Sequence, residues 1–458
     1  MIRDRSFYRT LFRISLPAAF QALVSFLVVV ADDIMVSRLA DATHVQAAVS
    51  QVNGITAFYT ATLTGLVSGS SVLIAQYWGK KDLDAIQRIF AIVLRICLIV
   101  AIVFVLAARL APNPILSLVI GKDEPAVLAN ALQYFTIVCF TWLPFAVTTA
   151  LIGMLRAVEV VRIALIVSIV SLLMNVSLNW ALIFGRIGFP ALGVRGAAIA
   201  TLITRIFEMV IVWVYAFHRQ KVLQLTPRAL LLSDRTLAKD YFRYGLPVGL
   251  TDMQWALIGM LKAAIIGHMG ATFMAANNIA SSMANLGTLF TFALAGGACV
   301  MVGKAVGAGD ISLAKRYSNT IQLLFLGIGL IMSLIVFLLR TPFTRLYGSA
   351  NDPEVFSLST TLIAVLAVTL IGTSYHASCF VGINRGAGDT RFVAIVDSIC
   401  GWLIVLPCTF LAAFVFKLSL PIVFLSTRID QCFKWLIAFL RLRTNKWIQN
   451  VTRDEIST

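Results

Sequence analysis

A few polar residues lie inside long apolar segments, where they could bind an ion. Asp32 is near the end of the apolar segment 14–37, and Asn175 and Asn179 lie in the segment 163–184. Because residues four positions apart share one face of a helix, the two asparagines would point in the same direction. A carboxylate inside a bilayer costs at least a few kcal/mol unless it is paired or hydrated. These residue types could therefore take up H⁺ or Na⁺.

Thr201, in the apolar segment 191–216, completes this candidate site. At the rise of an α-helix, Asp32 would lie about 8 Å below the outer end of its segment and Thr201 about 15 Å deep. We expect the oxygens of Asp32, Asn175, Asn179 and Thr201 to converge in the outer half of the N-terminal lobe. The alternative is that the asparagines and the threonine only hydrogen-bond to one another between helices.

Three ionisable residues in the second half form possible secondary polar sites. Lys262 occupies a position equivalent to that of Asp32 under an internal repeat, and it could pair with an acidic group or extend its ammonium towards the bilayer surface. Asp397 and His376 could form a titratable pair, although a polar contact between helices is the simpler interpretation.

Helices that cross a membrane must position these residues. The chain has 458 residues, of which 59% are hydrophobic and 13% are charged, so it lacks the polar surface of a soluble protein. A span takes about 20 residues, and this length accommodates about twelve spans with no room for a catalytic domain. The apolar segments lie at 14–37, 46–71, 89–111, 132–154, 163–184, 191–216, 244–267, 276–302, 318–339, 360–383, 392–416 and 420–440. We predict an all-α membrane protein.

The net charge of +16 indicates membrane topology rather than nucleic-acid binding, because the basic residues are spread over short connections. Most of them fall on one side if the N-terminus is cytoplasmic, so the positive-inside rule places both termini inside. The seven cysteines lie in apolar segments without a CxxC pair, which disfavours a metal site. The chain has no HExxH or GxxxxGK[ST] motif, and neither an enzyme nor an ATP-driven pump is indicated.

An internal repeat divides the chain into two halves. Three short landmarks recur at an offset of about 230 residues, as in repeat-built transporters. The paired landmarks are Ser15-Leu16-Pro17 with Gly245-Leu246-Pro247, Gly79-Lys80-Lys81-Asp82 with Gly307-Ala308-Gly309-Asp310, and Leu155-Arg156-Ala157 with Asn384-Arg385-Gly386. We predict two pseudo-symmetric six-helix lobes, 1–216 and 244–440, joined by a cytoplasmic linker, 217–243, and followed by a basic cytoplasmic tail, 441–458.

These landmarks and several further stretches resemble the multidrug and toxic compound extrusion (MATE) family over nearly the whole chain. The stretches are Asp32-Asp33-Ile34-Met35-Val36, Ala75-Gln76-Tyr77-Trp78-Gly79, Gly193-Val194-Arg195-Gly196-Ala197-Ala198-Ile199-Ala200-Thr201 and Asn384-Arg385-Gly386-Ala387-Gly388-Asp389-Thr390. The resemblance implies a twelve-helix, two-lobe fold and export of organic cations or other amphiphiles in exchange for H⁺ or Na⁺. It also implies an ion site at Asp32, Asn175, Asn179 and Thr201.

The chain departs from the family pattern in both halves. Some members carry a second carboxylate where this chain has Asn179, which leaves H⁺ and Na⁺ as alternatives here. Other members place coupling carboxylates in the seventh and tenth spans, where this chain has Trp255 and Val381. We therefore expect no equivalent ion site in the C-terminal lobe.

The hypothesis from the sequence is a secondary active transporter that exports organic cations or amphiphilic drugs by antiport with H⁺ or Na⁺. The alternative is a lipid-linked oligosaccharide flippase of the same fold superfamily. We expect a monomer in the plasma or inner membrane that contacts small-molecule substrates and membrane lipids. No cofactor beyond the coupling ion, and no nucleic-acid partner, is expected.

Overall fold

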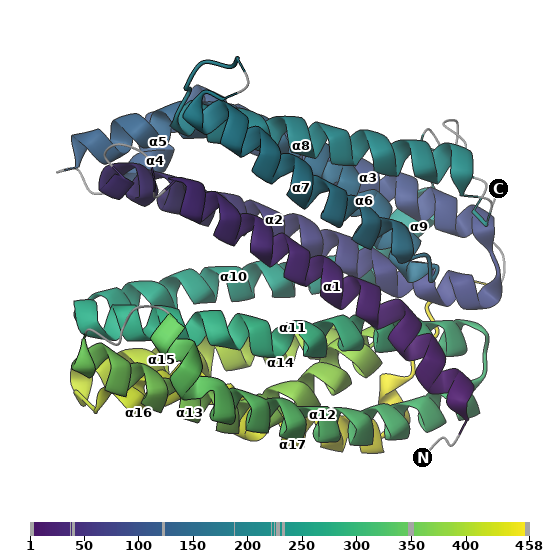
Figure 1. Ribbon diagram of the computed structural model, residues 1–458. Helices are drawn as coiled ribbons and strands as arrows, with labels where there is room; N and C mark the ends of the chain where they lie inside the picture. Colours follow the sequence, from purple (N-terminus) through teal and green to yellow (C-terminus); the bar gives the residue numbers. More distant parts are fainter. Residues whose placement is uncertain are drawn as a thin grey trace. The chain divides into compact units, whose positions relative to one another are not determined.

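The computed structural model is helical and has no strand in the residues that it describes (Figure 1). These are residues 4–36, 38, 42–120, 124–186, 188–220, 222–223, 225, 230, 234–346 and 352–453, without the side chains of residues 33, 42 and 43. Parts of the linker expected at 217–243 and the end of the tail expected at 441–458 fall outside them.

The helices divide into two compact units. The N-terminal unit comprises Phe20–Ser71 and Leu83–Tyr241, and the C-terminal unit comprises Met1–Ala19, Val72–Asp82 and Phe242–Thr458. Two segments of the first predicted lobe, 1–19 and 72–82, thus pack with the second half of the chain. The helices α1 (Arg5–Val36) and α2 (Ala42–Lys80) each contribute to both units.

The remaining helices each belong to one unit. Those of the N-terminal unit are α3 (Leu83–Leu110), α4 (Pro112–Ser117), α5 (Pro125–Val138), α6 (Trp142–Ala157), α7 (Arg162–Phe184), α8 (Val194–Val214) and α9 (Arg235–Asp240). Those of the C-terminal unit are α10 (Leu246–Gly267), α11 (Ala271–Gly307), α12 (Ile311–Leu346), α13 (Pro353–Ala377), α14 (Thr390–Ser398), α15 (Leu406–Phe410), α16 (Leu420–Ser426) and α17 (Asp430–Arg443). Wider π-helical turns, η6 (Ser378–Asn384), η7 (Ile399–Val405) and η8 (Leu411–Val415), extend α13, α14 and α15.

Ten helical stretches of the described residues are long and apolar enough to cross a membrane. The other two predicted spans, 244–267 and 420–440, correspond to α10 and to the pair α16 and α17. Asp252 and Lys262 make α10 less apolar than the other spans. The segment 420–440 is divided between α16, with 7 residues, and α17, with 14, and each is too short to cross a membrane by itself. The all-α membrane fold expected from the sequence is confirmed.

A tight turn places α8 against the end of α7. Gly185 ends α7 with a φ of 66°, a left-handed conformation that glycine adopts without steric cost. A Cβ atom at Gly196 would lie 2.6 Å from the Leu182 carbonyl oxygen, so only glycine lets the start of α8 approach α7 this closely. The two helices then pack along each other, which fixes the face that carries Asn175 and Asn179.

The N-terminal unit has an aromatic core between α2, α3 and α6. The Tyr59 and Trp142 rings stack at 5.0 Å, and Phe104 contacts both of them. The Tyr59 hydroxyl donates a 2.6 Å hydrogen bond to the Trp142 carbonyl, which satisfies a polar group that would otherwise be costly to bury. These contacts hold the helices of this unit at defined rotations.

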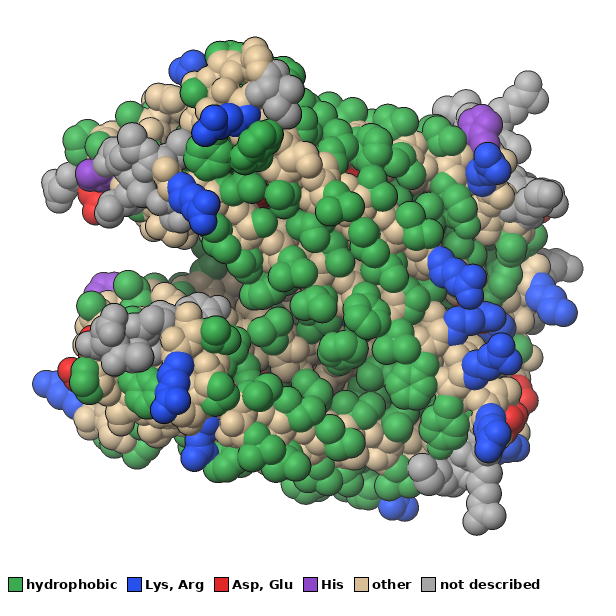
Figure 2. Space-filling model, viewed as in Figure 1, with side chains coloured by type: hydrophobic (Ala, Val, Ile, Leu, Met, Phe, Trp, Pro, Cys, Tyr) green, Lys and Arg blue, Asp and Glu red, His purple; other side chains and the backbone are tan. Residues whose placement is uncertain are grey.

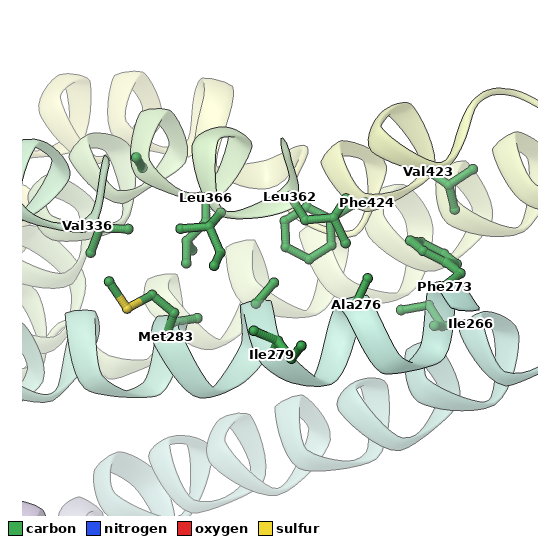
Figure 3. Packing of buried hydrophobic residues seen from close by; sticks show 14 of the residues in the cluster. Ile266, Phe273, Ala276, Ile279, Met283, Val336, Leu362, Leu366, Val423 and Phe424 are labelled. Carbon is green, nitrogen blue, oxygen red and sulfur yellow. The ribbon is translucent and has the colours of Figure 1, made fainter. Parts of the chain in front are cut away.

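The C-terminal unit has an aliphatic core along α11, where residues from α12, α13 and α16 interdigitate (Figure 3). Met283 of α11 lies near Val336 and Leu366, whereas Phe273 lies near Val423 at the other end of the cluster. The small residue Ala276 between these ends lets the neighbouring helices approach closely, as is typical of packing in membranes.

Apolar side chains also cover the outer surface of the helices. On the face seen in Figure 2, green hydrophobic side chains extend along the helices, and Lys and Arg side chains gather near the helix ends. Leu173 is 64% exposed and Ile331 is 60% exposed, and both lie near the middle of predicted spans. Such a surface is stable in a bilayer and would aggregate in water.

The residues after α17 pack against the end of α2, within the C-terminal unit. Gln76, fully buried, accepts a 2.8 Å hydrogen bond from the Val451 amide and donates to the carbonyls of Gly386 and Gln449. Trp447 is 2% exposed. The segment 444–453 is therefore packed against the protein, which its basic residues alone did not indicate.

Candidate ion-coupling site

The N-terminal unit brings three of the four predicted site residues into contact. Asp32 lies four residues before the end of α1, and Asn175 and Asn179 share one face of α7. The Asn179 amide nitrogen donates one hydrogen bond to the Asp32 carboxylate and another, of 3.1 Å, to the Asn175 side-chain oxygen. Both amide hydrogens of Asn179 are thus used, and the three side chains form a continuous polar chain across two helices.

This chain of polar groups is shielded from solvent except at its carboxylate end. Asn175 is 1% exposed and Asn179 is fully buried, whereas Asp32 is partly exposed. The Asn179 side-chain oxygen is buried and has no hydrogen-bond partner among the described residues. A buried acceptor without a donor is costly, so its presence beside a carboxylate marks a position for a proton donor or a cation.

Thr201 lies on α8, the helix that packs against α7. Its hydroxyl donates a 3.0 Å hydrogen bond to the carbonyl of Ala197, one turn earlier in α8. Among the described residues, no hydrogen bond joins Thr201 to the other three members of the predicted site. The hydroxyl keeps its lone pairs for a ligand, because its own hydrogen is used within the helix.

The C-terminal unit contains a buried ion network that the sequence analysis identified only in part. The Asp397 carboxylate of α14 lies 2.5 Å from the Lys434 ammonium of α17, and Asp430 lies 3.5 Å from the same ammonium. The side chains of Lys434 and Asp430 are each 2% exposed. Asp397 is thus paired with Lys434, rather than with His376 as considered above.

His376 and Lys262 lie at the edge of this network. The His376 ring nitrogen Nδ1 donates a 3.1 Å hydrogen bond to the Gly372 carbonyl, which leaves Nε2 as the acceptor in the neutral ring. In the described part of the chain no hydrogen bond joins His376 to Asp397. The Lys262 ammonium lies 3.4 Å from the Thr427 carbonyl and 5.9 Å from the Trp255 ring centre. Its side chain is partly exposed, and no ion pair joins it to a carboxylate among the described residues.

Lys434 and Asp430 are the residues that the sequence analysis missed. Their i, i+4 spacing inside the apolar segment 420–440 is a signal that could have identified them, because opposite charges at this spacing meet on a helix surface. Asp397 as the partner on another helix could not be read from spacing. It depends on how α14 and α17 are rotated towards each other.

Two arginines at repeat-related positions make parallel contacts, one in each unit. Arg156 at the end of α6 donates a 2.9 Å hydrogen bond to Gln21 of α1. Arg385, just after η6, forms a 2.8 Å ion pair with Asp252 of α10. In each half the arginine after the fourth span therefore reaches the first span, and the partner is neutral in one half and charged in the other.

The chemistry available at these positions is ion and proton binding. The described residues contain no group of three His, Cys, Asp or Glu residues that could hold a metal ion. The N-terminal unit presents one carboxylate with amide and hydroxyl oxygens, a set that suits H⁺ or a hard monovalent cation. The C-terminal unit presents two carboxylates around an ammonium that the chain itself supplies.

A protein-family model agrees with the repeat. The MatE family model matches residues 17–181 and again 247–411, so that the two matches have equal length and cover most of the chain. The two matches start at residues 17 and 247, and this separation equals the offset of about 230 residues between the paired sequence landmarks.

Curated relatives and a solved structure are similar to this chain over three quarters of its length or more. The probable multidrug resistance protein NorM of Bacillus anthracis is 28% identical over 364 residues, which is 77% of each chain. The probable multidrug resistance protein NorM of Thermotoga maritima is 23% identical over 98% of this chain and 95% of its own. A multidrug resistance MATE family transporter of the MOP superfamily, solved in an outward-facing conformation, superposes with a TM-score of 0.85 at 19% identity, over 97% of this chain and 96% of its own.

Proposed function

The chain belongs to the MatE family of membrane transporters, and from this premise we propose that it exports organic cations or amphiphilic drugs by antiport with H⁺ or Na⁺. Asp32 is the coupling residue. The observation that supports this proposal is the carboxylate of Asp32, which lies inside a membrane-spanning helix and is hydrogen-bonded to the buried amide of Asn179. Such a group is too costly to keep in a bilayer without a function or a partner.

The hydrogen bonding of the Asn179 amide depends on whether Asp32 is protonated. With Asp32 ionised, the Asn179 amide nitrogen donates to the carboxylate. Once Asp32 takes up a proton it becomes a donor, and the matching acceptor is the Asn179 oxygen, which has no partner among the described residues. Protonation therefore favours rotation of the amide, which also breaks its hydrogen bond to Asn175. Sodium uptake would act on the same oxygens.

The change at Asp32 is coupled to transport through α1, which contributes to both units. An ion can shift the balance between two conformations only by binding one of them more tightly. A rearrangement of the Asp32 contacts alters how the outer end of α1 is held against α7. We propose that ion uptake favours the conformation that releases the substrate, and that ion release favours the one that binds it.

The proposed setting is the cell membrane, with both termini in the cytoplasm and with the chain acting as a monomer. Cysteines introduced into the loops at 38–45 and 340–357 should react with an impermeant maleimide added outside intact cells. Cysteines in the linker 217–243 should react only after the cells are opened. Labelling of the linker from outside would contradict this orientation.

Transport in proteoliposomes tests the function directly. The wild-type chain should move a fluorescent organic cation against its gradient when an H⁺ or a Na⁺ gradient is imposed, and Asp32→Asn should abolish this movement. Asp310→Asn is the matched control, because Asp310 caps α12 at an exposed turn and asparagine preserves the cap. Wild-type transport by Asp32→Asn would exclude Asp32 as the coupling residue.

The same vesicles separate the drug exporter from the flippase alternative. A wild-type chain that moves no organic cation under either gradient, but transfers a lipid-linked oligosaccharide between leaflets, would favour the flippase.

A further inference from the structure

The ammonium of Lys434 lies in a cage of oxygen atoms and aromatic rings in the C-terminal unit. Asp397 contributes an oxygen at 2.5 Å and Asp430 an oxygen at 3.5 Å. The ammonium also lies 4.8 Å from the ring centre of Trp255 and 5.6 Å from that of Phe380. The cage thus draws on α10, η6, α14 and α17, and the Lys434 side chain is 2% exposed.

Every wall of this cage favours a monovalent cation. Carboxylate oxygens are preferred ligands of hard cations, and aromatic faces attract a cation through their quadrupole. The Gln431 amide donates a 2.8 Å hydrogen bond to Asp430 and holds that carboxylate in place. Lys262 and Arg428 lie within electrostatic reach of Asp430, and Arg385 lies within reach of Asp397, so that these cations offset part of the two negative charges. One centred positive charge therefore satisfies the cage.

Helix packing alone does not explain this arrangement. A buried ion pair is often no more stable than apolar residues of similar volume, because each ion loses its hydration. Two carboxylates on different helices are directed at one point in an apolar bundle. Their charges are compensated only if a cation occupies that point. A lysine ammonium is a compact charge on a flexible stem and can occupy such a position.

We propose that the C-terminal unit contains a monovalent-cation site, formed by Asp397 and Asp430, which the chain fills permanently with the ammonium of its own Lys434. Because this cation is tethered, the C-terminal unit cannot exchange it with solvent. Removal of the ammonium should therefore open a site for a free cation of similar charge and size, with Na⁺ as the simplest candidate. The inference concerns binding and does not depend on the proposed direction or substrate of transport.

The test compares the purified full-length chain with Lys434→Ala by thermal unfolding at pH 8 in NaCl or choline chloride of equal ionic strength. Choline serves as the control cation, because its methyl groups keep its charge away from carboxylate oxygens. At a Na⁺ concentration well above the dissociation constant, the midpoint of Lys434→Ala should rise by about 5 °C relative to choline. The wild-type midpoint should respond less to sodium than that of Lys434→Ala, because the ammonium already occupies this site and only sodium uptake at Asp32 could contribute.

The double variant Lys434→Ala/Asp397→Asn is the matched control for the site itself. It loses the carboxylate closest to the ammonium and should lose the sodium response of Lys434→Ala. Equal midpoints of Lys434→Ala in the two salts would overturn the proposal, as would an equally large sodium response in the wild-type chain or in the double variant.

A second comparison applies if Lys434→Ala cannot be recovered in any salt. Lys434→Ala/Asp430→Asn retains one carboxylate and buries less uncompensated charge. Recovery of this variant after purification in NaCl but not in choline chloride would support the proposal. Equal recovery in both salts, or in neither, would overturn it.

Discussion

The two units solve the same problem, a carboxylate inside an apolar helix bundle, in different ways. In the N-terminal unit Asp32 receives hydrogen bonding from a neutral amide, and the adjacent Asn179 oxygen has no partner among the described residues. In the C-terminal unit Asp397 is closed off by the Lys434 ammonium. A neutral partner leaves the carboxylate able to gain and lose a charge at moderate cost, whereas a buried ammonium fixes the charge state. The arrangement at Asp32 suits repeated uptake and release of an ion, whereas the arrangement at Asp397 suits a permanent structural contact.

Burial follows the same division. Asp32 is partly exposed, while the side chains of Asp430 and Lys434 are each 2% exposed. A coupling ion must enter and leave, so access is required at the first site. The repeat-related arginines show a similar contrast, since Arg156 contacts the neutral Gln21 and Arg385 contacts the charged Asp252.

The largest expected effect separates the roles of the two carboxylates. Asp32→Asn should reduce gradient-driven transport to the level of empty vesicles and should change the free energy of unfolding by less than about 1 kcal/mol, because asparagine keeps the shape and can still hydrogen-bond. Asp397→Asn should instead destabilise the chain by about 3 kcal/mol, since it removes the nearest partner of a buried ammonium. Transport assays and denaturant titrations of both variants measure the contrast. Equal losses of stability would remove the distinction between the sites.

A second prediction concerns the ammonium in a sodium-free buffer. Lys434→Ala should lower the free energy of unfolding by about 3–5 kcal/mol, because two buried carboxylates then lose their nearest countercharge. Lys262→Ala is the matched control, since its ammonium is held by a carbonyl at 3.4 Å and should contribute about 1 kcal/mol. Denaturant titration in choline chloride distinguishes them. A smaller loss for Lys434→Ala than for Lys262→Ala would contradict the assignment of the central cation.

A third prediction removes all three charges together. The variant Lys434→Met/Asp397→Asn/Asp430→Asn should be more stable than Lys434→Ala by about 2 kcal/mol or more, because no uncompensated ion remains buried. The sodium response of its unfolding midpoint should be no larger than that of the wild-type chain. A triple variant as unstable as Lys434→Ala would show that packing of the lysine stem, rather than its charge, matters at this position.

The smallest effect is expected from the repeated arginine contacts. Gln21→Ala should cost about 1 kcal/mol as a neutral partner of Arg156, and Asp252→Ala should cost about 2 kcal/mol as the charged partner of Arg385. Thermal unfolding of the two single variants measures the difference. A larger loss of stability for Gln21→Ala than for Asp252→Ala would contradict the prediction that the charged contact is the stronger of the two.

The N-terminal site could be predicted largely from residue types and spacing. Asp32 stands out because carboxylates are rare in apolar segments, and Asn175 and Asn179 share a helix face by their i, i+4 spacing. Thr201 was expected in the same group, but its hydroxyl hydrogen is used within α8. The direction of a side-chain hydrogen bond depends on the rotamer and the local backbone, which spacing does not determine.

The cluster in the C-terminal unit shows where spacing stops being informative. Asp430 and Lys434 lie one turn apart on α17, so their contact follows from the sequence once the helix is known. The pairing of Lys434 with Asp397 joins α14 to α17, and it also draws in the rings of Trp255 and Phe380 from α10 and η6. Each of these contacts depends on how far one helix is rotated against the next.

The sequence by itself therefore determined the membrane-embedded helices, the repeat and the carboxylate of Asp32 in α1, because hydrophobicity, length and residue type act locally along the chain. The tertiary structure alone decided that segments 1–19 and 72–82 join the C-terminal unit and that Lys434 meets Asp397. The physical reason is that these contacts are set by helix rotation and by close approach at small residues. At Gly307, for example, a Cβ atom would lie 1.9 Å from the Gln76 carbonyl oxygen, and many residues distant in sequence fix such an approach together.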